Sequence, residues 1–113
     1  MAVTVGGETV NPNSTVGTVF TVTYNAMDAA GNMAVQATRM VTVVDTTPPV
    51  ITVLNPEVTT AARNGIYTDP GATATDSVDG VVAVVVGGDT VDTSASVNTA
   101  FTITYNAMDT AGN

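Results

Sequence analysis

The stretch YNAMDAAGN at residues 24–32 returns almost unchanged as YNAMDTAGN at residues 105–113. The repetition extends beyond this phrase, because residues 1–32 align with residues 82–113 without a gap and 20 of the 32 positions are identical. The two copies are 81 residues apart, which is too long for one coil of a solenoid and suits a small β-sandwich domain. The sequence therefore predicts a tandem array of β-domains with a repeat of about 81 residues.

The two copies of the phrase have different continuations. The first is followed by MAVQATRMVTVVD at residues 33–45, whereas the second ends at Asn113, the last residue. We therefore divide the chain out of phase into residues 1–45, the C-terminal part of one repeat, and residues 46–113, the next repeat without its last strand. Three interpretations of the open strand edges remain: a fragment of a longer chain, strand exchange that joins neighbouring chains into a homo-oligomer, and a compact rearrangement within one chain.

The composition favours β-structure, because valine and threonine dominate and β-branched residues suit pleated strands better than helices. In AFTITYNAMD at residues 100–109, Phe101, Ile103, Tyr105 and Ala107 share one face, which is typical of a half-buried strand. Further strands are predicted at residues 2–5, 35–44, 50–54 and 81–86, and the Gly-Gly pairs that follow the first and last of these are interpreted as turns. Many short strands separated by turn signals predict an all-β, immunoglobulin-like β-sandwich.

The residue types that are missing exclude several functions. The chain has no cysteine and no histidine, which excludes Cys/His zinc sites, thiol catalysis, disulfides and histidine acid–base chemistry. Ten acidic residues against two arginines give a formal charge of −8, which disfavours binding to nucleic acid and to anionic lipid. No apolar run is long enough to insert into a membrane. Few aromatic residues and no tryptophan disfavour a glycosidase cleft, and we expect that the chain is not an enzyme.

Three stretches resemble the bacterial immunoglobulin-like repeats of large surface proteins, a group related to the hyalin repeats. They are VVDTTPPVITVL at residues 43–54, YTDPGATATDSVDG at residues 67–80 and YNAMDTAGN at residues 105–113. The resemblance implies a structural spacer repeat of an extracellular, adhesin-type protein on the bacterial cell surface, with neighbouring repeats of the same protein as partners. Two alternatives stay open: an accessory module of a secreted enzyme that binds carbohydrate or protein, and a subunit that self-assembles through strand exchange.

Acidic and amide side chains are predicted to gather at one end of the second domain. In an immunoglobulin-like sandwich, the entry to the first strand and two of the loops lie at the same end, and these segments carry Asp45, Asp76, Asp79, Asp109 and Asn113. Carboxylates at close range repel one another unless they are solvated or bridged by a cation, and Ca²⁺ takes six to eight oxygen ligands. The hypothesis is therefore that Ca²⁺, with no other cofactor, binds here and stiffens the array. The alternative is that these residues form ordinary turns.

Overall fold

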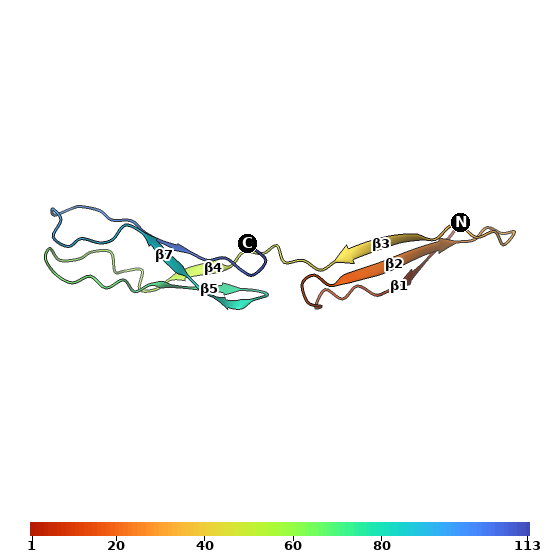
Figure 1. Cartoon of the computed structure of the whole chain (residues 1–113), viewed down its shortest axis with the longest axis horizontal. Helices are drawn as coiled ribbons and strands as arrows, with labels where there is room; N and C mark the ends of the chain where they lie inside the picture. Colours follow the sequence, from red (N-terminus) through yellow and green to blue (C-terminus); the bar gives the residue numbers. More distant parts are fainter. The chain divides into compact units, whose positions relative to one another are not determined.

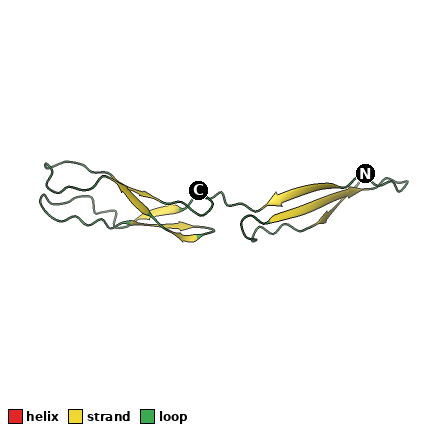
Figure 2. Cartoon of the chain, in the orientation of Figure 1, coloured by secondary structure: helices red, strands yellow, loops and turns green.

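The protein is built from β-strands alone. The computed structural model describes all 113 residues and contains eight strands and no helix (Figure 2). The prediction of an all-β fold is therefore confirmed. The chain forms two compact units, which are Met1–Asp45 (unit 1) and Thr46–Asn113 (unit 2). Their strands make three small antiparallel sheets, one in unit 1 and two in unit 2.

Unit 1 is a single three-stranded sheet with β2 at its centre (Figure 1). Its strands are β1 (Val3–Gly7), β2 (Val19–Ala26) and β3 (Ala37–Thr42), and each pairs antiparallel with its neighbour. Unit 1 contains no second sheet to cover either face of this one. Every side chain of β2 except that of Val19 is half-buried, so burial does not alternate between the two faces of this strand.

Unit 2 contains two sheets. The first is made of β4 (Val50–Val53), β5 (Ala72–Asp76) and β6 (Gly80–Val82), and the second of β7 (Val85–Gly88) and β8 (Ile103–Asn106). The prediction of one strand at residues 81–86 is wrong, because the chain leaves the first sheet after β6 and enters the second at β7. Strand β5 begins directly after Pro70 and Gly71, which agrees with the inability of proline to donate a ladder hydrogen bond.

The two copies of the repeated sequence form the same strand pair. Val5 lies opposite Tyr24 in the pairing of β1 with β2, and Val86 lies opposite Tyr105 in the pairing of β7 with β8. These four positions are related by the sequence offset of 81 residues. The hydrogen bond that extends each pair also recurs, from Glu8 N to Thr21 O at 2.9 Å and from Asp89 N to Thr102 O at 2.7 Å.

The Gly-Gly pairs lie at the ends of strands, so their interpretation as turns is wrong. Gly7 is the last residue of β1 and Gly88 the last residue of β7, and their φ angles are 79° and 80°. A Cβ atom on Gly7 would lie 2.6 Å from the carbonyl oxygen of Thr21, and one on Gly88 would lie still closer to that of Thr102. Only glycine combines a left-handed backbone with so close an approach to the facing strand.

The hydrophobic core is small. Ala74 in β5 is the only buried apolar side chain, at 1% exposure, and no large side chain is fully buried. Large apolar residues are instead exposed in both units, among them Val35 in unit 1 and Ile66 in unit 2, at 96% each. Each unit therefore leaves large apolar side chains exposed.

Candidate metal site

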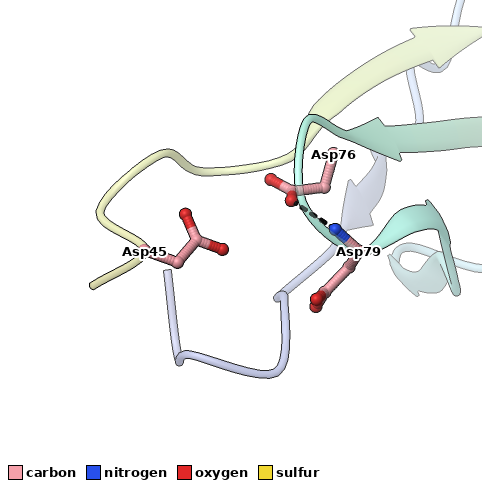
Figure 3. Close-up of side chains that lie close together, drawn as sticks. All are labelled: Asp45, Asp76 and Asp79. Carbon is pink, nitrogen blue, oxygen red and sulfur yellow. Dashed lines mark hydrogen bonds between the residues drawn. The ribbon is translucent and has the colours of Figure 1, made fainter. Parts of the chain in front are cut away.

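Three of the carboxylates predicted to bind metal lie together (Figure 3). One oxygen atom from each of Asp45, Asp76 and Asp79 lies within 4.8 Å of the other two. Asp76 ends β5 and Asp79 lies in the turn to β6, while Asp45 directly precedes Thr46, the first residue of unit 2. Ligands on opposite sides of one ion can be about 5 Å apart for Ca²⁺ and about 4 Å apart for Mg²⁺. Three carboxylate oxygens within 4.8 Å of one another are therefore compatible with the flexible oxygen coordination of Ca²⁺.

The carboxylate of Asp76 is fixed by its own turn. Its Oδ1 accepts hydrogen bonds from the backbone N–H groups of Val78 at 2.7 Å and Asp79 at 2.9 Å. The side chain is only 8% exposed, and its Oδ2 is buried without a hydrogen-bond donor. Leaving a buried acceptor unsatisfied costs about 1–3 kcal/mol, and a cation held by the cluster would satisfy it.

Asp79 connects the turn between β5 and β6 to the loop that follows β8. Its Oδ2 accepts a hydrogen bond from the backbone N–H of Thr110 at 2.6 Å, and its Oδ1 lies 3.0 Å from the Thr110 hydroxyl. Each carboxylate oxygen has a second lone pair, so these contacts orient Asp79 without preventing it from binding a cation. The loop that contains Asp109 is thus held next to the cluster.

Asp109 and Asn113 form hydrogen bonds with each other and lie outside the group of three carboxylates. The backbone N–H of Asn113 donates to Asp109 Oδ1 at 2.8 Å, and its side-chain amide donates to Oδ2 at 2.9 Å. Asp28 and Asn32 make the same two bonds in the first copy, at 2.8 and 2.7 Å. The repeated phrase therefore folds into the same loop twice, and these contacts are the turn chemistry that was the alternative to metal binding.

The hydrogen bonds in these loops also change acidity. Burial alone would raise the pKa of Asp109, but the hydrogen bonds from Asn113 and the neighbouring backbone outweigh it, and the pKa is lowered. The side-chain hydrogen bond from Asn32, assisted by backbone hydrogen bonds, lowers the pKa of Asp28. Both carboxylates are thus held in the charged form, which accepts the loop's N–H groups.

A second polar cluster, in unit 2, was not predicted from the sequence. Its centre is the carboxylate of Asp69, which accepts hydrogen bonds from two tyrosines and one backbone N–H. The hydroxyl of Tyr67 donates to Oδ1 at 2.8 Å, and the hydroxyl of Tyr105 lies 2.7 and 2.8 Å from the two oxygens. The backbone N–H of Gly71 donates to Oδ2 at 3.1 Å. The hydrogen bonds from Tyr105 and Tyr67 lower the pKa of Asp69. The hydrogen bond between Tyr105 and Asp69 also raises the pKa of Tyr105 to about 12. In sequence, Asp69 has only the signature of a turn residue.

These tyrosines lie on the wall of an open cavity of about 670 Å³ inside unit 2. The cavity is lined by residues that include Leu54, Phe101 and Ile103 together with Arg63 and Tyr105. Because residues of β4 and β8 line the same space, the cavity lies between the two sheets of this unit. The interior of unit 2 is therefore only partly filled by its own side chains.

Comparison of the chain with protein-family models, with curated proteins and with solved structures found no match. No helix of the chain has the length and apolar character needed to cross a membrane. A functional proposal for this chain therefore depends on its sequence repeat, its strand pairing and its acidic cluster.

Proposed function

We propose that this chain is a structural spacer repeat of a bacterial extracellular or cell-surface protein of the adhesin type, built from immunoglobulin-like domains that bind Ca²⁺. The proposal rests on a structural repetition. The pair of β1 with β2 and the pair of β7 with β8 have the same register, each is followed by the same Asp–Asn loop, and the two copies are 81 residues apart in the sequence. Repeated units with the same local structure are typical of arrays whose task is to extend and to separate. A net charge of −8 keeps such a surface soluble and disfavours adhesion to other anionic surfaces.

The acidic cluster supports the Ca²⁺ component of the proposal. The chain has no lysine, and its two arginines lie elsewhere: Arg39 is 5.7 Å from the centre of the Tyr24 ring, and Arg63 lines the cavity of unit 2. A divalent cation would offset the repulsion among the three carboxylates. Extracellular modules bind Ca²⁺ with dissociation constants of about 10⁻⁴ to 10⁻³ M, so a site of this kind is occupied at millimolar Ca²⁺ and empty at micromolar Ca²⁺.

Thermal unfolding with and without Ca²⁺ tests this component. At about 10 mM Ca²⁺, dissociation constants in that range predict a stabilisation of about 1.4–2.7 kcal/mol. We expect Asp76→Asn to abolish the response, because it removes a charge from the buried member of the cluster and leaves an amide oxygen for the turn. Glu57→Gln is the matched control, because it removes one negative charge outside the cluster. Absence of a Ca²⁺ response in the unmodified chain, or equal responses in the two variants, would contradict the proposed site.

Surface labelling tests the spacer component separately. Antibodies raised against the 113-residue chain should label intact cells of the source bacterium, because a spacer repeat of a surface protein is accessible from outside. Labelling that requires permeabilised cells would overturn the extracellular assignment. This outcome does not depend on whether the acidic cluster binds Ca²⁺, so the two components can fail independently.

A further inference from the structure

The cavity of unit 2 lies at one end of this unit, between two long loops. Residues 54–71 connect β4 to β5 and residues 89–102 connect β7 to β8, and both loops lie at the end away from Asn113 (Figure 1). Most of the residues that line the cavity belong to these loops, and the others belong to β4 and β8. Its volume of about 670 Å³ is within the range of about 300–1,000 Å³ that is typical of small-molecule sites.

Aromatic rings gather on the wall of this cavity. The chain has three tyrosines and two phenylalanines, and Tyr67, Phe101 and Tyr105 all line the cavity. Each of these side chains is half-buried, so part of each remains accessible to a ligand. The faces of aromatic rings attract cations, and groups of such rings are used to bind quaternary ammonium ligands.

A charged carboxylate lies beside two of these rings. The hydroxyls of Tyr67 and Tyr105 lie 2.8 and 2.7 Å from Oδ1 of Asp69, so the two tyrosines meet at this side chain. Their hydrogen bonds lower the pKa of Asp69, which keeps the carboxylate charged at neutral pH. The hydrogen-bond donors to Asp69 are two hydroxyls and the N–H of Gly71, none of which carries a positive charge. The charge of Asp69 is therefore not part of an ion pair within the chain.

The charges around the cavity favour a cation over an anion. The carboxylates of Asp69 and Asp92 line it against one guanidinium, that of Arg63, and the whole chain has a charge of −8. Such a field raises the local concentration of cations and repels anions. Leu54 and Ile103 add apolar surface to the same walls, which suits methyl groups better than a metal ion that requires oxygen ligands. The ligand that fits these walls is an organic cation.

We propose that the cavity of unit 2 binds a small organic cation with a quaternary ammonium group. The positively charged nitrogen lies near Asp69 and the three aromatic rings, and its methyl groups contact the apolar part of the wall. Such a ligand goes beyond the spacer function, because it gives the repeat a binding activity of its own. It is also independent of the Ca²⁺ site, since Asp69 is not a member of the acidic cluster.

Choline and its neutral isostere, in which a carbon atom replaces the nitrogen, test this site directly. Each compound is titrated into the full 113-residue chain, and the ¹⁵N amide signals are followed by NMR. We expect choline to shift the signals of Asp69, Gly71 and Tyr105 with a dissociation constant of about 1 mM or lower. The isostere should bind about tenfold more weakly, because it lacks the charge. Equal affinities for the two compounds, or no shift at these residues at about 10 mM choline, would overturn the proposal.

Paired variants test whether the charge of Asp69 is responsible. Asp69→Asn removes one negative charge inside the cavity and keeps an oxygen that accepts hydrogen bonds, whereas Glu57→Gln removes one negative charge outside it. We expect Asp69→Asn to weaken choline binding about tenfold and Glu57→Gln to leave it within about twofold. Equal affinities of the two variants for choline would contradict the assigned site.

Phe101→Leu tests the aromatic wall separately. It removes one ring, keeps apolar bulk and leaves the hydrogen bonds of Asp69 in place, so it tests the site even if Asp69→Asn does not fold. We expect this substitution to weaken choline binding about threefold or more and to leave binding of the neutral isostere unchanged. Equal effects on the two compounds would show that the ring does not contact a cation, and would refute the proposal.

Discussion

Substitution of Gly88 by alanine tests the repeated strand pair most directly. Gly88 has a φ angle of 80°, and an alanine Cβ there would press on the backbone oxygen of Thr102 and lie 3.1 Å from the backbone nitrogen of Thr104. Both contacts are with backbone atoms, so no flexible side chain can move aside. Relief of the clash must displace the facing strand, including the hydrogen bond of 2.7 Å from Asp89 N to Thr102 O.

The destabilisation combines four contributions. A non-glycine residue in the left-handed region costs about 1–2 kcal/mol, and replacing glycine recovers about 0.4–1 kcal/mol by restricting the unfolded chain. Weakening the displaced hydrogen bond adds about 0.5–1.5 kcal/mol, and residual contact adds more. Gly71→Ala is the matched control, because Gly71 has a φ angle of 82° and a Cβ atom added there would have nothing within 4 Å. The difference between the two variants therefore isolates the contact, and we expect it to be at least about 1 kcal/mol.

Urea unfolding followed through the NMR signals of β8 measures this difference in unit 2. The midpoint should fall further for Gly88→Ala than for Gly71→Ala at an unchanged dependence on urea. Equal destabilisation by the two substitutions would refute the reasoning, because it would mean that the strands are not in contact at this point. Gly7→Ala should have the corresponding effect in unit 1, where its Cβ would meet Thr21 O at 2.6 Å.

Three further predictions concern the polar clusters. The contact with Asp69 raises the pKa of Tyr105 from 10.0 to about 12, so the stability from this contact is present below pH 10 and is lost as pH rises toward 12. In Asp69→Asn, ultraviolet titration should no longer show a tyrosine that ionises near pH 12. Persistence of that late step in the variant would contradict the assignment. Asn32→Ala removes the side-chain hydrogen bond to Asp28 and should raise the lowered pKa of Asp28 toward 3.8. The stability from this hydrogen bond is present above pH 3.8 and is lost as pH falls through the lowered pKa. A carboxyl ¹³C titration of Asp28 that is unchanged in the variant would argue against the contact. Mg²⁺ should raise the melting temperature less than Ca²⁺ at equal concentration, because Mg²⁺ demands near-octahedral geometry and gives up its bound water reluctantly. Equal shifts would contradict this selectivity.

The sequence by itself determined the features that depend on neighbouring residues. Alternation of apolar and polar residues predicted β8, where Ile103 and Tyr105 are half-buried and Thr104 and Asn106 are exposed. The repeated phrase predicted one structure at two places, and both copies form it, because the hydrogen bonds of Asp28 with Asn32 span only four residues. Local bonding and backbone preference act within a few residues, so they can be read from a short stretch of sequence.

Only the tertiary structure decided which distant residues meet. Asp69 contacts Tyr105 across 36 residues and Asp79 contacts Thr110 across 31, and neither pair has a signature in the sequence. The split of residues 81–86 between two sheets likewise depends on where the chain crosses from one sheet to the other. Such contacts arise only when the sheets assemble. The strand propensity of a segment specifies that it is extended, but it does not specify which other strand pairs with it.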